Sequence, residues 1–300
     1  MKKIEHILCP VDFSPVSEST VAAAGKMAQK LGANLTLIHV VSVIPASYGA
    51  LYGIDFQAID TVELINSSTK ALEEVRQKHI PAGISCHIVS VTGNVASEVI
   101  SEVKKSSIDL IVMATSGAHG VEEFLIGSNA AKISRSAPCA VLTMRNPESW
   151  KTSGKILIPL DISLGLKALR DFLGSYITYE NFEAELLVIS EPGYKDPHPN
   201  ATQIFMEKQI EALNAYGIEK VTWQEVFSED IVETICKYAQ ENHFEMIMMK
   251  SEGRSTFAKF LLGSNTEGVI NHSEIPVLTV RVESRDSKSR FTGSMIPSPW

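Results

Sequence analysis

The chain has 300 residues, of which 44% are hydrophobic and 21% charged, so it can bury the cores of two domains of ordinary size. Its formal net charge of −8 at pH 7 argues against DNA, RNA and anionic membranes as partners, since those require a basic face. With no signal-like start, no apolar run of membrane-spanning length, no Cys-x-x-Cys pair and no clustered histidines, we expect a cytoplasmic protein without structural zinc.

The first half alternates short apolar runs with segments of helical periodicity, a pattern typical of a parallel sheet with helices on both faces. After the first run, Ser14 and Pro15 predict the start of a helix, and Gly32 predicts its end. A long connection follows the second run, and its latter part reads as another helix. The expected strands are residues 7–11, 35–41, 87–91, 110–114 and 140–144.

The second half repeats the first. The segment Ile-Leu-Cys-Pro-Val-Asp-Phe-Ser that begins at Ile7 is echoed at Ile156, an offset of 149 residues. The segment Phe-Leu-Ile-Gly-Ser-Asn that begins at Phe124 is echoed at Phe260, an offset of 136 residues. A sustained echo of this kind indicates a tandem duplication. We therefore predict one α/β domain at residues 1–146 and a second at 155–282, joined by a short linker, with a disordered tail at 283–300.

Polar and glycine residues follow the predicted strands where a ligand would lie. In an open parallel sheet, ligands bind outside the carboxyl ends of the strands, where the strand order reverses. Asp12 follows the first strand, and Gly117 and Gly127 flank the loop after the fourth, with Ser128 opening a helix. Backbone N–H groups at a helix start attract anions, and Asp12 could accept hydrogen bonds from a ribose. Alternatively, the glycines form only a turn and Asp12 only caps a helix.

These motifs together resemble the universal stress protein family. They are Pro10-x-Asp12-x-Ser14 after the first strand, Met113-Ala-Thr-Ser-Gly117 after the fourth, and Gly127-Ser128 nine residues further on. The resemblance extends through residues 3–145 and 155–281. It implies the adenine nucleotide alpha hydrolase-like fold, here as two tandem open parallel five-stranded sheets with helices on both faces.

ATP-binding members of the family carry the motif Gly-x2-Gly-x9-Gly-(Ser/Thr). The resemblance therefore implies ATP, with or without Mg²⁺, as the ligand of each half. The residues implied for the first site are Pro10, Asp12, Val40, Met113, Ala114, Gly117, Gly127, Ser128 and Asn129. Those implied for the second site are Pro159, Asp161, Ile189, Met249, Lys250, Gly253, Gly263, Ser264 and Asn265.

Both halves depart from the motif at its first glycine. Ala114 adds one methyl group in the first half, whereas Lys250 places a long side chain where ribose should pass in the second. Lys250 could instead pair with a phosphate, but Glu252 adds a negative charge to the same loop. We therefore expect the first site to bind ATP and the second to bind it less well.

The sequence contains no group that would activate water for catalysis. It has neither the Gly-x4-Gly-Lys-(Ser/Thr) loop nor clustered carboxylates for magnesium, so we assign no catalytic residue and no metal ligand. The leading hypothesis is a nucleotide-dependent regulatory module of the stress response with an unidentified protein partner. The alternatives are an interaction scaffold that binds no nucleotide and a slow ATP hydrolase. The resemblance also implies that residues 140–144 and 276–280 pair edge to edge within the chain, while a homodimer stays open.

Overall fold

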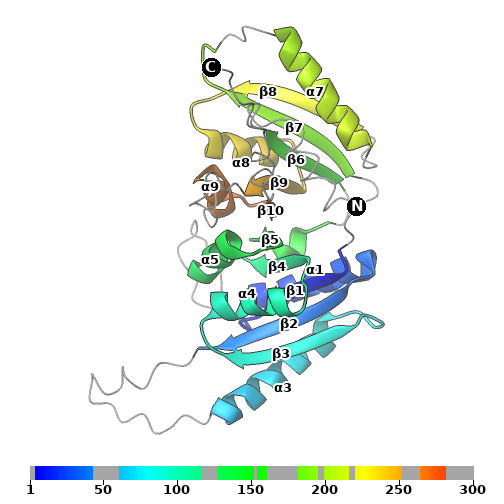
Figure 1. Ribbon diagram of the computed structural model, residues 1–300, viewed down its shortest axis with the longest axis vertical. Coiled ribbons are helices and arrows are strands. Elements are labelled where there is room, and N and C mark those ends of the chain that lie inside the picture. Colours follow the sequence, from blue (N-terminus) through cyan, green and yellow to red (C-terminus); the bar gives the residue numbers. More distant parts are fainter. Residues whose placement is uncertain are drawn as a thin grey trace, which may run out of the picture.

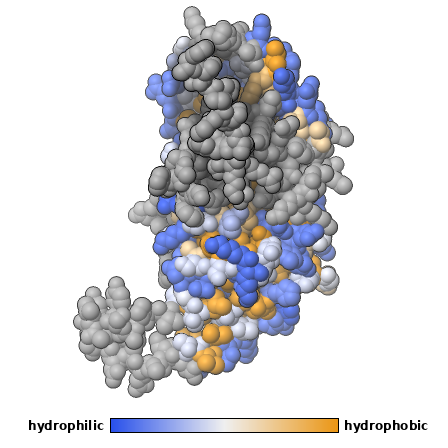
Figure 2. All heavy atoms as spheres, in the orientation of Figure 1, coloured by the Kyte–Doolittle hydropathy of each residue, from blue (hydrophilic) through white to orange (hydrophobic). Residues whose placement is uncertain are grey.

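Ten strands form one continuous sheet in the computed structural model, with helices on both of its faces (Figure 1). The structure describes residues 4–42, 61–115, 127–151, 154–160, 182–194, 199–215, 220–251 and 264–281. On the visible face of the first half, polar and apolar residues are interspersed (Figure 2). No helix in the described ranges is long and apolar enough to cross a membrane.

The described elements follow the predicted alternation, except that the segment between β6 and β7 lies outside the described residues. In the first half they are β1 (His6–Pro10), α1 (Pro15–Leu31), β2 (Asn34–Val41), α3 (Thr61–His79), β3 (Cys86–Thr92), α4 (Val95–Lys105), β4 (Leu110–Ala114), α5 (Ser128–Ser136) and β5 (Ala140–Met144). A 3₁₀ turn, η1 (Pro147–Ser149), occupies the predicted linker. In the second half they are β6 (Gly154–Leu160), β7 (Phe182–Ser190), α7 (Pro199–Asn214), β8 (Lys220–Phe227), α8 (Ile231–Glu241), β9 (Met246–Ser251), α9 (Ser264–His272) and β10 (Val277–Arg281).

The strand order is β3-β2-β1-β4-β5-β10-β9-β6-β7-β8. Every pair within a half is parallel, and the central β5–β10 pair, which we call the seam, is antiparallel. The predicted edge-to-edge pairing is thus confirmed, with Leu142 opposite Leu278. Because the two halves run in opposite directions, the carboxyl ends of their strands lie at opposite edges of the sheet. In the first half the order reverses between β1 and β4.

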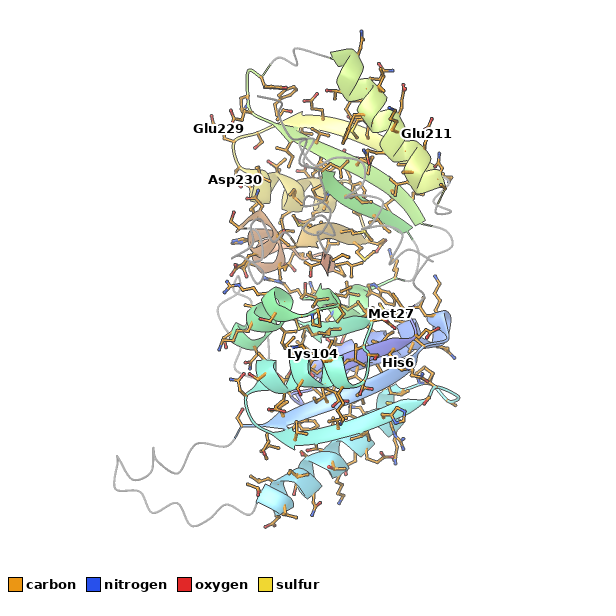
Figure 3. The ribbon with its side chains drawn as sticks, viewed as in Figure 1. His6, Met27, Lys104, Glu211, Glu229 and Asp230 are labelled. Carbon is orange, nitrogen blue, oxygen red and sulfur yellow. The ribbon has the colours of Figure 1, made fainter. Side chains whose placement is uncertain are left out.

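Side chains cap the starts of several helices, as the sequence pattern indicates. Ser14 caps α1 through the Ser17 N–H, and α1 ends at Gly32, whose left-handed φ of 63° suits glycine. Asn94 caps α4, and Asp230 caps α8 at the surface (Figure 3). These caps satisfy N–H groups that the first turn of a helix leaves unpaired.

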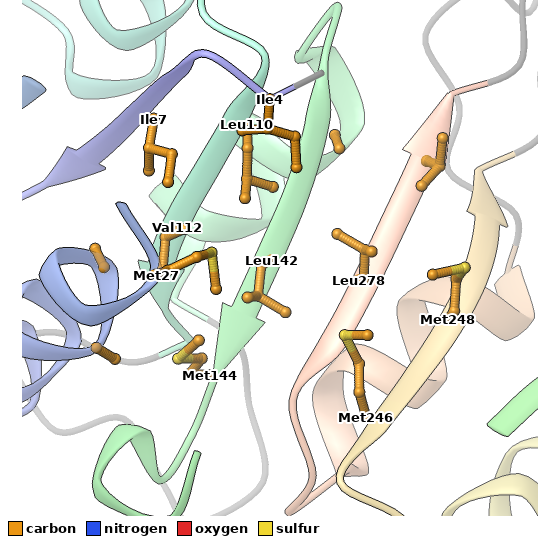
Figure 4. Packing of buried hydrophobic residues seen from close by; sticks show 14 of the residues in the cluster. Ile4, Ile7, Met27, Leu110, Val112, Leu142, Met144, Met246, Met248 and Leu278 are labelled. Atoms are coloured by element: carbon orange, nitrogen blue, oxygen red, sulfur yellow. The ribbon is translucent and has the colours of Figure 1, made fainter. Parts of the chain in front are cut away.

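One hydrophobic core runs beneath α1, α3 and α7 and continues across the seam. Met144 and Leu142 of the first half lie in the same cluster as Leu278, Met246 and Met248 of the second (Figure 4). Two smaller cores, one in each half, lie on the opposite face of the sheet, where α4 and α5 cover the first and α8 and α9 the second. The shared core joins the halves more extensively than strand pairing alone would do.

Buried hydroxyl groups add hydrogen bonds across the seam. Thr143 donates to the carbonyl of Val277 at 3.2 Å, and Thr279 donates to the carbonyl of Val141 at 3.2 Å. Nearer the surface, Asn146 donates to Glu274 at 2.9 Å. The two threonine bonds are equivalent: one runs from β5 to β10 and the other from β10 to β5. This symmetry is expected when two copies of one domain meet edge to edge.

Candidate functional site

Several of the residues predicted for the first site lie at the carboxyl ends of β1 and β4, while Val40 lies near the end of β2. The strands β1 and β4 are neighbours, with Ile7 opposite Leu110 and Leu8 opposite Ile111. After β1 the chain continues into α1. After β4 comes Thr115, and the next described helix is α5. The arrangement places the site at the reversal of strand order, where open parallel sheets bind ligands.

Asp12 organises the turn after β1, which we call the Asp12 turn (residues 11–14). Its Oδ1 accepts hydrogen bonds from the backbone N–H of Ser14 at 3.0 Å and from the Ser14 hydroxyl at 2.6 Å. The Asp12 N–H donates to the hydroxyl of Ser17 at 3.1 Å. Asp12 does not itself cap α1, since Ser14 is the N-cap residue, but it holds that residue in place. Asp12 is also exposed.

Two aromatic side chains that the sequence did not assign to the site lie at this turn, one within it and one on the neighbouring strand β2. Phe13 adopts a left-handed φ of 64°, and its ring centroid lies 4.5 Å from that of His39 on β2. The His39 Nδ1 lies 2.7 Å from the carbonyl oxygen of Val11. Because a carbonyl can only accept, Nδ1 carries the hydrogen of this bond. A comparison of the two copies would have singled out both positions, since Ile162 and Val188 replace them in the second.

The loop before α5 is closed at its base. The Gly127 N–H donates to the carbonyl of Thr115 at 2.7 Å, and the Thr115 N–H donates to the carbonyl of Met144 at 3.0 Å. The Gly127 N–H is therefore already bonded within the chain. Closing a loop requires its ends to meet, and a bond between them satisfies both polar groups. Gly117 lies outside the described residues.

The N-cap residue of α5 supplies no side-chain cap. Gly127 occupies that position with a φ of −57°, and no side-chain cap bond to the first turn is present among the described residues. Ser128 and Asn129, the first two residues of the helix, are exposed. The first N–H groups of α5 are thus suited to an anion, because they carry the positive end of the helix dipole.

The remaining residues predicted for the first site are parts of strands. Pro10 ends β1 and Ala114 ends β4, and both are half-buried. Val40 and Met113 are buried in the core beneath α4 and α5. Any contact that these two residues make with a ligand would therefore use mainly their backbone.

The second site is only partly described. Pro159 and Ile189 lie in β6 and β7 and are half-buried, and Met249 is buried in β9. Lys250 follows it in β9, opposite Val280. Two further predicted residues, Ser264 and Asn265, open α9 and are exposed. Asp161, Gly253 and Gly263 lie outside the described residues.

The titratable groups of the described residues form no metal cluster. No group of three or more His, Cys, Asp or Glu side chains is placed to hold an ion within the described ranges. All four cysteines lie in those ranges, and none of them forms a disulfide. Burial raises the pKa of Cys86 to about 11 and that of Cys236 to about 11, and it also raises the pKa of Cys9.

Comparison with known proteins agrees with this architecture. The pattern of the universal stress protein family matches residues 3–145 and 181–281. Universal stress protein Slr1230 of Synechocystis sp. is 22% identical over 297 residues, which span 93% of this chain and 100% of that protein. Universal stress protein A homolog 1 of Coxiella burnetii is 32% identical over 148 residues, 47% of this chain and 95% of that protein. A universal stress protein from Archaeoglobus fulgidus has the same fold, with a TM-score of 0.66 at 22% identity over 93% of this chain and 97% of that one.

Proposed function

The chain belongs to the universal stress protein family, with its role in the stress response, and we propose that its first half binds ATP between the Asp12 turn and the start of α5. Nucleotide occupancy would then regulate the protein's contact with a partner. The observation that carries the proposal is the start of α5, which no described side chain caps. This helix follows β4, the strand that pairs with β1, and Asp12 lies just beyond β1.

The start of α5 supports a phosphate-binding role because no described residue caps its N–H groups with a side chain. A phosphate placed there would accept hydrogen bonds from the first turn and would interact favourably with the helix dipole. The exposed hydroxyl of Ser128 adds a donor. The helices α1, α4 and α8 differ in this respect, because Ser14, Asn94 and Asp230 already occupy the corresponding positions.

The polar turn after β1 supports the placement of the nucleoside at the same edge. The carboxylate of Asp12 is exposed there, and ribose hydroxyls are donors that a carboxylate accepts well. Mg²⁺ would accompany the phosphates, since this ion keeps several waters and needs few protein ligands.

We propose weaker binding in the second half. Ser264 and Asn265 open α9 as Ser128 and Asn129 open α5, but Lys250 stands in β9 where the first half has Ala114. A lysine at this position either crowds the ribose or pairs with a phosphate. The number of ATP molecules bound per chain separates the two cases. If Lys250 crowds the ribose, one ATP binds per chain at moderate concentration, and if Lys250 pairs with a phosphate, two bind.

Mass spectrometry of ligand released from freshly purified protein, followed by calorimetry with ATP and MgATP, tests the proposal. We expect an adenine nucleotide and about one tight site per chain. Gly127→Asp should lower ATP affinity by about tenfold or more, because the new carboxylate caps α5 and repels phosphate. The matched control Gly127→Asn supplies a neutral cap and should lower affinity less. A chain that copurifies with no nucleotide and binds no ATP would overturn the proposal in favour of an interaction scaffold.

A further inference from the structure

We propose that His39 is a positioning residue of the first nucleotide site. Together with Phe13 it forms a contact, which we call the aromatic latch, that holds the Asp12 turn in its binding shape. The inference rests on the proposed function and adds to it a reason why the two halves differ.

The latch acts on the residue before Asp12. The Val11 N–H donates to the carbonyl of Ile38 on β2 at 2.8 Å. Its carbonyl oxygen accepts the Nδ1–H of His39 at 2.7 Å. Strand β2 thus holds Val11 on both sides, once through backbone and once through the imidazole. The position of the peptide that leads into Asp12 therefore depends on His39.

The latch also acts on the residue after Asp12. Phe13 has a φ of 64°, a left-handed conformation that is unfavourable for a residue with a side chain, so other contacts must compensate. The ring of Phe13 is tilted by 39° against the imidazole of His39, at a centroid distance of 4.5 Å. Tilted aromatic pairs at this distance attract each other. One histidine therefore supports both neighbours of Asp12.

The second half lacks both members of the pair. In the sheet, Ile7 is opposite Leu35 and Ile156 is opposite Ala184, so the two copies share one register. By that register, and by the offset of 149 residues between the two aspartates, Val188 corresponds to His39 and Ile162 to Phe13. Both positions are aromatic in the first copy and both are aliphatic in the second, which is expected if each aromatic residue is useful only with the other.

The test transplants the second copy's pair into the first. The variants are His39→Val, the double variant Phe13→Ile with His39→Val, and His39→Asn, whose amide N–H can replace Nδ1–H. The matched control is His87→Val, which makes the same change at an exposed position of the neighbouring strand β3. Hydrogen exchange of the Asp12, Ser14 and Ser17 amides is measured without nucleotide, and ATP affinity is measured by calorimetry.

We expect the double variant to fold, because the second copy folds with that pair, and to exchange these three amides at least about tenfold faster than wild type. Its ATP affinity should fall by about tenfold, the result of a misplaced contact group. His39→Asn should keep most of the affinity, and His87→Val should change neither measurement.

Two results overturn the inference, and a third concerns the proposed function. If the double variant exchanges the turn amides as slowly as wild type, His39 and Phe13 do not hold the turn. If wild type binds ATP and His39→Val binds it equally well, the positioning role is wrong while the proposed function stands. If wild type binds no ATP, the proposed function itself falls, whatever the variants do to exchange.

Discussion

Asp12 holds Ser14 by two hydrogen bonds at once, because its Oδ1 accepts both the Ser14 N–H at 3.0 Å and the Ser14 hydroxyl at 2.6 Å. Ser14 in turn caps α1. A single carboxylate oxygen thus joins the end of β1 to the start of the first helix. Removal of the Asp12 carboxylate should therefore affect both the stability of the chain and ligand binding at the candidate site.

Asp12→Ala should lower the free energy of unfolding by about 1 kcal/mol, since both bonds to Ser14 are lost. Asp12→Asn keeps an acceptor oxygen and should cost less than half as much. Urea denaturation of the two variants measures the difference, and calorimetry measures their ATP affinity. We expect both variants to bind ATP less well, because both lack the charge that we propose accepts hydrogen bonds from the ribose hydroxyls. Equal stability of the alanine and asparagine variants would show that the bonds to Ser14 contribute nothing.

The seam offers a second prediction. Thr143→Val and Thr279→Val each remove one buried hydroxyl bond while keeping a β-branched side chain of similar size. Each should cost about 1 kcal/mol of unfolding free energy. Denaturation followed by fluorescence should show one transition for wild type and for both variants, because the shared core makes the halves unfold together. Two separate transitions in wild type would contradict that coupling.

The buried amide of Gln209 is a position where we predict that a substitution stabilises the chain. The Gln209 side chain on α7 is 0% exposed, and neither its amide oxygen nor its amide nitrogen has a hydrogen-bond partner among the described residues. Gln209→Leu should raise the free energy of unfolding by about 1–3 kcal/mol, because an unpaired buried amide is costly. The control is Gln203→Leu, an exposed position on the same helix, where the change should be within about 0.5 kcal/mol. A Gln209 variant that is less stable than wild type would indicate that the amide is satisfied in solution.

The raised pKa values of two cysteine thiols predict that the stability of the chain falls at alkaline pH. Burial raises the pKa of Cys86 and of Cys236 from an ordinary value of 9.0 to about 11, so the folded chain resists losing these protons. The stability they contribute is complete below pH 9 and is lost as the pH rises towards 11, because only the unfolded chain ionises readily in that range. At pH 8 their alkylation by iodoacetamide should be about 100-fold slower than that of a free cysteine. Alkylation of Cys86 or Cys236 at the rate of a model thiol would contradict the burial that the structure shows.

Local patterns in the sequence were enough to predict the architecture of each half. Strands, caps and periodic helices depend on neighbouring residues, so Ser14 and Gly32 marked the ends of α1 correctly. The repeat and the family resemblance together led to the pairing of the two halves, which the β5–β10 ladder confirms. The same information placed Asp12 and Gly127 at one edge of the sheet.

Features that depend on contacts between distant segments could be seen only in the tertiary structure. The sequence placed Gly127 before a helix start, but it did not show that the Gly127 N–H donates to the carbonyl of Thr115, because that bond depends on how the folded chain brings the two residues together. The pairing of His39 with Phe13 and the continuity of one core through the seam likewise join residues far apart in the chain. Periodicity reports which face of an element is apolar; it does not report which side chain from another element will meet it there.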